Sequence, residues 1–423
     1  MSNPLYDHLF GKHVGQFTPF LSLPDRTSIT HTQFLEQAAQ IALVLAQNGL
    51  QAGDRVAAQV EKSPQALALY AACVRAGIVF LPLNTGYTTD ELIYFIEDSG
   101  ARTLVCDQRV APELASLGTR IETLNADGSG TLTERAGTMP TAFATVDRGT
   151  EDLAALLYTS GTTGRSKGAM LTQRNLLSNA EVLVDAWRFT SDDVLLHALP
   201  IFHTHGLFVA TNVCLLAGSR MIFLPKFDVD QLIEWMPKSS VLMGVPTFYT
   251  RLLDDPRFTK ELTAQMRLFI SGSAPLLAET HAMFEQRTGH RILERYGMTE
   301  TNMNTSNPYE GERRAGTVGF ALPGVELKIT DPETGEPVAK GEVGQIEVRG
   351  PNVFKGYWQM PEKTAEELRE NGFFITGDLG KFDADGYVHI VGRNKDLIIS
   401  GGYNIYPKEV ELVLDEQPAV LES

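Results

Sequence analysis

The chain carries its strongest local signal at residues 158–168, Tyr158-Thr159-Ser160-Gly161-Thr162-Thr163-Gly164-Arg165-Ser166-Lys167-Gly168. An apolar run from Leu153 to Leu157 precedes it and predicts a buried strand. The glycines permit tight turns with positive φ, and backbone N–H groups exposed in such a loop form a concave site for anions. Lys167 adds a mobile cation, and the Ser and Thr hydroxyls add donors. The stretch therefore predicts a loop that binds an oligophosphate.

Other interpretations of this stretch fit less well. A flexible Ser/Gly linker is the usual meaning of such a composition, but a linker needs neither a lysine at its end nor a strand directly before it. The spacing G-x-x-G-x-x-K-G differs from the Walker loop, G-x-x-x-x-G-K-[ST]. It also differs from the dinucleotide fingerprint, G-x-G-x-x-G. The pattern thus predicts phosphate binding by a different kind of loop.

Composition limits the classes of protein to which the chain can belong. At 423 residues it is too long for one compact core, which predicts at least two domains. The net charge of −16 argues against nucleic acid or an anionic membrane as a partner. No signal peptide or membrane span is visible in the sequence. The three widely spaced cysteines, Cys73, Cys106 and Cys214, fit reduced thiols in a cytoplasmic protein better than a disulfide framework.

Strands and helices alternate through most of the chain, which predicts an α/β fold with covered, mostly parallel sheets. Thr30 to Gln47 and Ser63 to Gly77 have helical spacing, with capping residues at their starts. Residues 107–150 lack periodicity and predict a variable surface connection. After Tyr309, short runs between turn residues predict a β-rich subdomain at about 310–392.

A second strong signal follows an apolar strand and reads Glu294-Arg295-Tyr296-Gly297-Met298-Thr299-Glu300. Gly297 permits a sharp turn and the close approach of a flat ligand. Glu300 supplies a carboxylate, a ligand that Mg²⁺ accepts beside phosphate oxygens. A solvated turn is the common alternative for a single acidic residue. In combination with the phosphate loop, the segment favours a magnesium–nucleotide site.

Three other segments carry little information by themselves. Ile270 to Pro275 has the composition of a strand-to-helix turn, and Asp378 that of a structural turn residue. His203 and His205 flank Thr204, but no third or fourth ligand is spaced to complete a zinc site.

Taken together, these motifs resemble those of the acyl-adenylate-forming superfamily, which comprises acyl-CoA synthetases, adenylation domains and luciferases. The resemblance runs from about residue 30 to the end of the chain. Arg-Tyr-Gly-Met-Thr-Glu at 295–300 and His-Thr-His-Gly at 203–206 are similar to the motifs of the malonyl-CoA synthetases. The resemblance implies a large N-terminal domain with two αβ-layered, mostly parallel sheets and a smaller β-rich subdomain.

The resemblance also implies roles for individual residues. The set expected to contact ATP or AMP is Thr159, Ser160, Gly161, Thr162, Thr163, Gly164, Lys167, Ser273, Ala274, Glu294, Arg295, Tyr296, Gly297, Met298, Thr299, Asp378 and Arg393. Glu300 and Thr159 are expected to hold Mg²⁺ and, with Lys167, to be catalytic. His203, Thr204 and Arg295 are expected to line the acid pocket. Lys395 is expected at the hinge, and Gly401 and Gly402 are expected at the coenzyme A tunnel.

Arg295 bears on the choice of substrate. Most members of the superfamily have a neutral residue before Tyr-Gly, and an arginine there suits a substrate with a second carboxylate. A bidentate arginine–carboxylate pair is geometrically specific, and each hydrogen bond to a charged group contributes roughly 1.5–3 kcal/mol. The alternative is that Arg295 pairs with a local acid, Glu294 or Glu285. Malonate is therefore expected, and methylmalonate, which differs by one methyl group, is not excluded.

The resemblance places a boundary near the end of the chain. Residues 1–392 match the large domain, 393–396 the hinge, and 397–423 the start of a C-terminal domain that is mostly missing. In the family, that domain supplies a lysine that catalyses adenylation, and no lysine of this chain stands in the same context.

We therefore expect an acid–CoA ligase that uses ATP, Mg²⁺ and coenzyme A and is impaired by truncation. The alternatives are a short-chain fatty acyl-CoA synthetase, another adenylating enzyme such as a luciferase-like oxidase, or a module that only binds its ligands. The sequence leaves the oligomeric state open, and a monomer is compatible with it.

Overall fold

Side-chain caps set the start of the first long helices. In the computed structural model, Thr30 and Gln33 form a reciprocal capping box at the start of α2 (His31–Gln47). α3 (Pro64–Ala76) begins behind Ser63 and ends at Gly77, which has a φ of 69°. These ends agree with the sequence-based expectation. The structure describes residues 2–159, 165–396, 398–400, 403–405, 410, 411, 413, 414 and 420.

The first sheet has six strands in the order β6-β5-β3-β4-β7-β8. All neighbouring strands are parallel except β7 and β8, which form an antiparallel pair. The strands are β3 (Arg55–Gln59), β4 (Val79–Pro82), β5 (Thr103–Cys106), β6 (Arg120–Thr123), β7 (Leu153–Thr159) and β8 (Lys167–Thr172).

The second sheet has nine strands in the order β15-β14-β13-β12-β11-β9-β10-β1-β2. Its strands from β13 to β1 are parallel, and antiparallel strands lie at both edges. The strands are β1 (Pro19–Ser22), β2 (Ser28–Thr30), β9 (Val194–His197), β10 (Arg220–Phe223), β11 (Val241–Gly244), β12 (Leu268–Ser271), β13 (Leu293–Met298), β14 (Asn302–Ser306) and β15 (Phe320–Ala321).

A smaller antiparallel sheet, in the order β16-β17-β18-β19, forms the β-rich subdomain. Its strands are β16 (Glu326–Thr330), β17 (Gly344–Arg349), β18 (Phe374–Phe382) and β19 (Val388–Arg393). β20 (Ile398–Ser400) and β21 (Tyr403–Ile405) form a separate antiparallel pair. The expected architecture of two mostly parallel sheets and a smaller β-rich part is confirmed.

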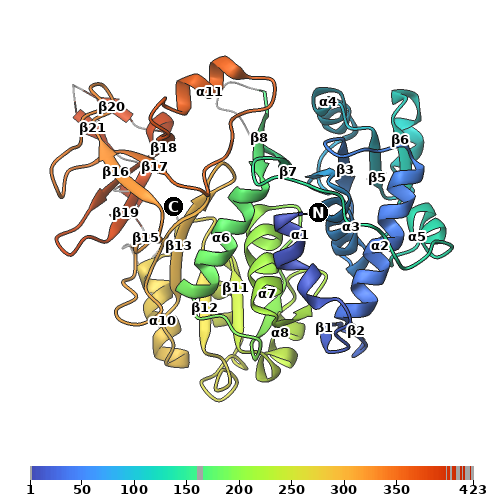
Figure 1. Cartoon of the computed structure of the whole chain (residues 1–423). Helices are drawn as coiled ribbons and strands as arrows, with labels where there is room; N and C mark the ends of the chain where they lie inside the picture. The colour runs from blue at the N-terminus through green and yellow to red at the C-terminus, as the bar shows by residue number, and fades with distance from the viewer. Residues whose placement is uncertain are drawn as a thin grey trace.

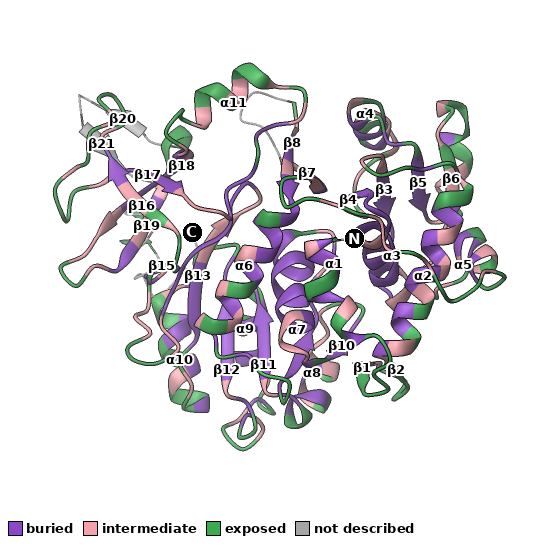
Figure 2. Cartoon of the chain, in the orientation of Figure 1, coloured by how far each residue is buried: buried purple, intermediate pink, exposed green. Residues whose placement is uncertain are grey.

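Helices cover the two large sheets (Figure 1). The remaining α-helices are α1 (Pro4–Leu9), α4 (Thr89–Ser99), α5 (Thr131–Ala136), α6 (Gln173–Ala186), α7 (Asn212–Ala217), α8 (Val229–Trp235), α9 (Pro246–Leu253), α10 (Ala278–Thr288) and α11 (Pro361–Glu367). Short 3₁₀ turns are η1 (Gly11–His13), η2 (Ala111–Leu117), η4 (Met236–Lys238) and η5 (Asn394–Asp396), and η3 (His205–Thr211) is a π-helix. Figure 2 shows buried strands beneath helices with exposed outer faces. In the described part of the chain, no helix combines the length and apolar character that a bilayer crossing requires.

Two parts of the fold differ from the sequence-based expectation. Residues 107–150 are not only a surface connection, because β6 extends the first sheet and α5 packs on α2. β15 falls inside the range expected for the β-rich subdomain but pairs with β14 of the nine-stranded sheet. β6 and β15 are both short strands at the edge of a sheet. Such strands show little hydrophobic periodicity in the sequence, and they form because they pair with a neighbouring strand.

Glu347 anchors the small sheet and gives a test of its stability. Its carboxylate is fully buried and accepts hydrogen bonds from Arg369 (2.7 Å), Lys328 (3.0 Å) and Thr330 (2.9 Å). Burial by itself raises the pKa of Glu347, but these donors outweigh it and hold the pKa below its ordinary value. The carboxylate is therefore ionised in the folded protein at neutral pH.

We expect Glu347→Gln to lower the free energy of unfolding by about 2 kcal/mol at pH 7. This is less than the roughly 3–5 kcal/mol of a fully buried pair, because Arg369 is 40% exposed. A depressed pKa stabilises the fold above the unfolded value, so the deficit should shrink as the pH falls below about 4.5. Urea titrations at pH 7 and pH 4 measure the difference in the free energy of unfolding between the variant and the original chain. Glu326→Gln, which breaks an exposed pair with Arg349, is the control and should lower the free energy of unfolding far less than Glu347→Gln does.

Candidate active site

The predicted phosphate loop joins β7 to β8. Thr159 ends β7 and is paired in register with Lys167, the first residue of β8. The predicted loop residues between them, Ser160, Gly161, Thr162, Thr163 and Gly164, lie outside the described residues. The loop therefore connects two antiparallel strands, unlike a Walker loop, which leads from a strand into a helix.

Lys167, Glu300 and Thr159, three of the residues predicted to bind phosphate or metal, lie close together where β7 ends and β8 begins. Thr159 Oγ1 lies 3.4 Å from Glu300 Oε1, and the Tyr357 hydroxyl donates to the same oxygen at 3.1 Å. Lys167 Nζ lies 3.1 Å from Glu367 and 3.2 Å from the Tyr357 hydroxyl. Figure 1 shows α11, which carries Glu367, passing above β8.

Glu300 has the properties of a cation ligand. The side chain is buried, and burial raises the pKa of its carboxyl group, while nearby Lys167 acts in the opposite direction. Among the described residues, no lysine or arginine forms an ion pair with Glu300. A buried carboxylate without an ion-pair partner among the described residues fits a hard cation such as Mg²⁺, which prefers oxygen ligands and retains substrate phosphates. Thr159 is placed to add a second oxygen.

Three residues from different strands form the predicted nucleoside site. The Tyr296 hydroxyl donates to Asp378 Oδ2 at 2.5 Å, and Arg393 Nε lies 3.3 Å from Asp378 Oδ1. Asp378 is buried, which raises the pKa of its carboxyl group, and Tyr296 and Arg393 counteract that rise. Gly297 continues β13 beside Tyr296, and a Cβ there would lie 2.0 Å from the Asn302 carbonyl oxygen.

Glu294 has a different environment from the other predicted nucleotide contacts. Its carboxylate accepts from the Gly316 N–H at 3.3 Å and lies 3.4 Å from His281 Nδ1. Its carbonyl oxygen accepts from the Asn307 side chain at 3.2 Å. Glu294 therefore holds the 307–317 segment in place, and the structure does not bring its side chain into the Tyr296–Asp378 group.

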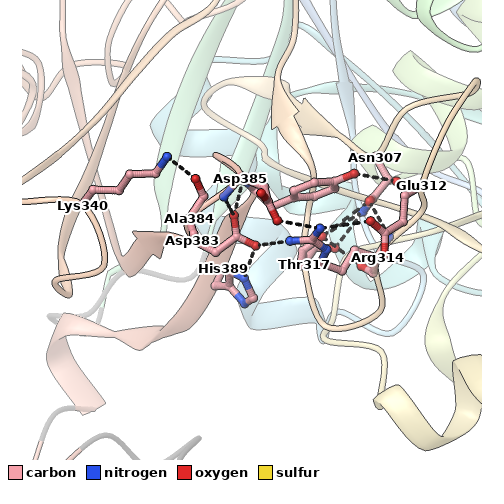
Figure 3. Close-up of polar contacts among 10 residues, drawn as sticks. Asn307, Glu312, Arg314, Thr317, Lys340, Asp383, Ala384, Asp385 and His389 are labelled. Carbon is pink, nitrogen blue, oxygen red and sulfur yellow. Dashed lines mark hydrogen bonds and ion pairs between the residues drawn. The ribbon is translucent and has the colours of Figure 1, made fainter.

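The same segment docks the small sheet onto the large one (Figure 3). Arg314 donates to Asp383 at 2.6 Å and to Asp385 at 2.9 Å, both in the turn between β18 and β19. Its guanidinium lies 4.2 Å above the centre of the Tyr387 ring. Because Asp378 and Arg393 belong to these two strands, the Arg314 cluster sets their position relative to Tyr296.

Arg295 belongs to β13, and its side chain is a buried cation without an ion-pair partner among the described residues. The side chain is buried, and its Nε and Nη2 atoms have no hydrogen-bond partner. Burial lowers the pKa of Arg295 to about 10, so the group is still charged at neutral pH. Both local acids proposed as partners are engaged elsewhere, since Glu285 pairs with Arg291 at 2.8 Å and Glu294 lies beside His281. Within the described ranges no carboxylate pairs with Arg295, so the alternative of a local ion pair is wrong.

Further buried polar atoms without partners gather in the same region. Besides Arg295, they are Thr204 Oγ1, His205 Nε2 and Ser271 Oγ. His205 Nδ1 lies 3.3 Å from Ser273 Oγ, and Arg295 contributes to the lowering of the pKa of His205, after burial. Buried polar groups are normally paired, so a cluster of orphans indicates a place for a polar ligand. His203 is exposed beside Phe202, with 4.5 Å between the ring centres.

The other predicted residues are placed as follows. Met298 and Thr299 follow Gly297 and are half-buried, while Ser273 and Ala274 are exposed after β12. Lys395 is exposed in η5, and Gly401 and Gly402 lie outside the described residues. Sequence reasoning missed Tyr357 and Glu367, which no motif marks. It also missed the side chain of Ser271, although that residue lies within the quoted Ile270–Pro275 segment.

The two sheets, the phosphate loop and the Tyr296–Asp378 group are the features of an enzyme that acts on a nucleotide. The family described as AMP-binding enzymes matches residues 14–358, and the chain belongs to this family. The chain is 38% identical over 374 residues to the malonate–CoA ligase of Arabidopsis thaliana, which covers 82% of this chain and 61% of that protein. It is 34% identical over 447 residues to a long-chain-fatty-acid–CoA ligase of Bacillus subtilis, with 94% and 79% covered.

Among solved structures, the chain is similar to ATP-bound MatB from Rhodopseudomonas palustris. The TM-score is 0.97 at 60% sequence identity, and the match covers 100% of this chain and 85% of that chain. The chain therefore spans most of MatB but about three fifths of the Arabidopsis enzyme.

Proposed function

We propose that the chain belongs to an ATP-dependent ligase that joins malonate to coenzyme A. The observation that carries the substrate assignment is the buried Arg295 guanidinium without a carboxylate partner, beside a nucleotide site. A monocarboxylate would leave this charge unpaired next to the reacting group. A dicarboxylate places its second carboxylate where Arg295, Thr204 and the other orphan polar atoms can receive it.

The proposed chemistry has two steps. A carboxylate oxygen of malonate attacks the α-phosphorus of ATP, forming an acyl–phosphate bond while the bond to pyrophosphate breaks. The thiol sulfur of coenzyme A then attacks the acyl carbon of malonyl-AMP, AMP leaves, and the thiol proton is released. Mg²⁺, when bound, neutralises charge on the phosphates.

The residues of this chain have separate tasks in this proposal. Glu300 and Thr159 hold the metal, and Lys167 binds the β and γ phosphates. Tyr296 packs against the base while Asp378 accepts from the ribose hydroxyls. Arg295 orients malonate so that its other carboxylate faces the α-phosphorus.

Turnover distinguishes this function from the second candidate, a module that binds without reacting. The chain is incubated with MgATP, coenzyme A and either malonate, methylmalonate or acetate, and pyrophosphate and thioester are measured. Malonate-dependent release of pyrophosphate, with little for acetate, is expected. Binding of malonate and ATP without pyrophosphate would favour the binding module, and release with acetate or a longer fatty acid in preference would point to another acyl-CoA synthetase.

Gly272 offers an indirect test of the Arg295 position. A Cβ at Gly272 would lie 2.4 Å from Arg295 Cζ, so an alanine there must displace the guanidinium. We expect Gly272→Ala to weaken malonate binding by about tenfold or more, with MgATP affinity nearly unchanged. Isothermal calorimetry measures both. Gly137→Ala, whose Cβ would meet the Thr133 and Glu134 carbonyl oxygens at 3.4 and 3.6 Å, is the matched control and should bind both ligands like the original chain.

The hinge at 393–396, the role of Lys395 and the coenzyme A contacts of Gly401 and Gly402 stay predictions. We also propose a cytoplasmic site of action, which is supported by three free, buried cysteines.

A further inference from the structure

Lys62 is a buried amine at the junction of the two large sheets, and burial lowers the pKa of Lys62 well below its ordinary value. It lies between β3 and α3 and is 7% exposed. Its Nζ lies 2.8 Å from His197 Nδ1, 2.8 Å from the His197 carbonyl oxygen and 4.4 Å from the centre of the Phe223 ring. Because β3 belongs to the first sheet and His197 to β9 of the second, this contact joins them. No carboxylate of the described residues pairs with Lys62, and burying an unpaired charge is costly.

His197 connects Lys62 to the turn at residues 204–206, which carries residues expected to line the acid pocket. Its Nε2 lies 2.9 Å from the Gly206 carbonyl oxygen, which can only accept, so Nε2 carries the hydrogen and Nδ1 accepts from Lys62. Thr211 also donates to that carbonyl at 2.9 Å. A Cβ on Gly206 would lie 1.9 Å from the Pro200 carbonyl, so the turn is tightly packed on both sides.

The turn held by His197 begins the π-helix η3 and presents Thr204 and His205. Both side chains are buried and have polar atoms without partners, as does Arg295. Arg295 and His197 both contribute to the lowering of the pKa of His205, after burial, so both lie within electrostatic reach of that ring. π-Helical turns often occur at functional sites. Lys62 therefore reaches the polar atoms of Thr204, His205 and Arg295 only through His197 and the turn that His197 holds.

We propose that Lys62 and His197 are positioning residues that make the pocket selective for dicarboxylates. They hold the Thr204–His205 turn against Arg295, the charged group that is proposed to receive the second carboxylate. The inference rests on the proposed function, because it assigns the residues that select its substrate class.

The test compares affinities for malonate, acetate and MgATP by calorimetry on the full chain, with MgATP present in the acid titrations. Lys62→Met keeps an unbranched side chain and removes the amine and its contact with His197. We expect malonate to bind about tenfold more weakly or worse, while acetate and MgATP change by less than about twofold. His197→Gln should reproduce this selective loss. The double variant should bind malonate about as well as whichever single variant has the lower malonate affinity, because the two residues act as one unit.

Tyr70→Phe is the matched control. It removes a buried 3.2 Å hydrogen bond from Tyr70 of α3 to Asn212 of α7, and it keeps the ring that lies against Phe208 of η3. This variant should keep the malonate-to-acetate affinity ratio. If Lys62→Met keeps that ratio, or loses all three ligands equally, the inference is wrong. If it does not fold, as judged by circular dichroism, His197→Gln is judged by the same criteria.

The same titrations separate this inference from the proposed function. An original chain that does not prefer malonate to acetate contradicts the proposed function itself. An original chain that prefers malonate, with a Lys62→Met variant that prefers it equally, contradicts only the role of Lys62.

Discussion

Replacement of Arg295 by alanine is expected to weaken malonate binding on the order of 100-fold or more, with MgATP affinity within about threefold. Two charge-assisted hydrogen bonds from a guanidinium contribute roughly 3–6 kcal/mol. Arg295 has Nε and Nη2 free of partners and fully desolvated, which is the state that such a pair requires. Arg295→Lys keeps the charge but loses the planar fork, so an intermediate loss is expected.

The control for this prediction is Arg291→Ala. Arg291 lies just before the same strand, is 46% exposed and pairs with Glu285, so its removal should change neither affinity. In the original chain, malonate affinity should be steady from neutral pH upward and fall as the pH approaches about 10, where Arg295 loses its proton. Equal losses of malonate and ATP affinity in Arg295→Ala would contradict the assigned role.

Replacement of Lys167 by alanine is expected to weaken ATP by about 10- to 100-fold and AMP by less than about twofold. The lysine stands at the end of the loop where the β and γ phosphates are expected, and AMP lacks both. In the ligand-free chain, Lys167 is paired with Glu367 and Tyr357, so ATP must replace these partners. Glu367 keeps Lys363 at 3.0 Å as a partner in the variant, which should therefore fold.

Calorimetric titrations with ATP and AMP measure this difference. Lys355→Ala serves as the control, because Lys355 is an exposed lysine in the segment beside β8 and contacts only the Glu151 carbonyl at 3.4 Å. Its removal should leave both affinities unchanged. A loss of AMP affinity as large as that of ATP would show that Lys167 does not act on the terminal phosphates.

Local signals in the sequence predicted much of the fold. The capping residues Thr30 and Ser63 and the stop at Gly77 act within one helical turn, so they can be recognised without tertiary context. β1 could not be predicted in the same way. It pairs with β10, about 200 positions later in the chain, and no local pattern encodes that partner.

In the candidate site, too, some features could be predicted from the sequence and others could not. The 294–300 motif pointed to Arg295 and Glu300 through the chemistry of their side chains, while the resemblance to the superfamily was needed to predict a role for Asp378, whose local sequence is that of a turn. Burial and missing partners could not be read from the sequence, since they depend on where every neighbouring acid points. Lys62 illustrates this: a lysine before Ser-Pro is ordinarily solvated, and its contact with His197 spans 135 positions.

The most direct test of the account is calorimetric titration of the chain with malonate and with acetate, each in the presence of MgATP. Methylmalonate in the same series measures how well the pocket accepts one more methyl group. The account predicts that malonate binds at least about tenfold more tightly than acetate, because only malonate provides a second carboxylate for Arg295. Equal affinities would contradict the dicarboxylate pocket, while the nucleotide site and the adenylating fold would stand.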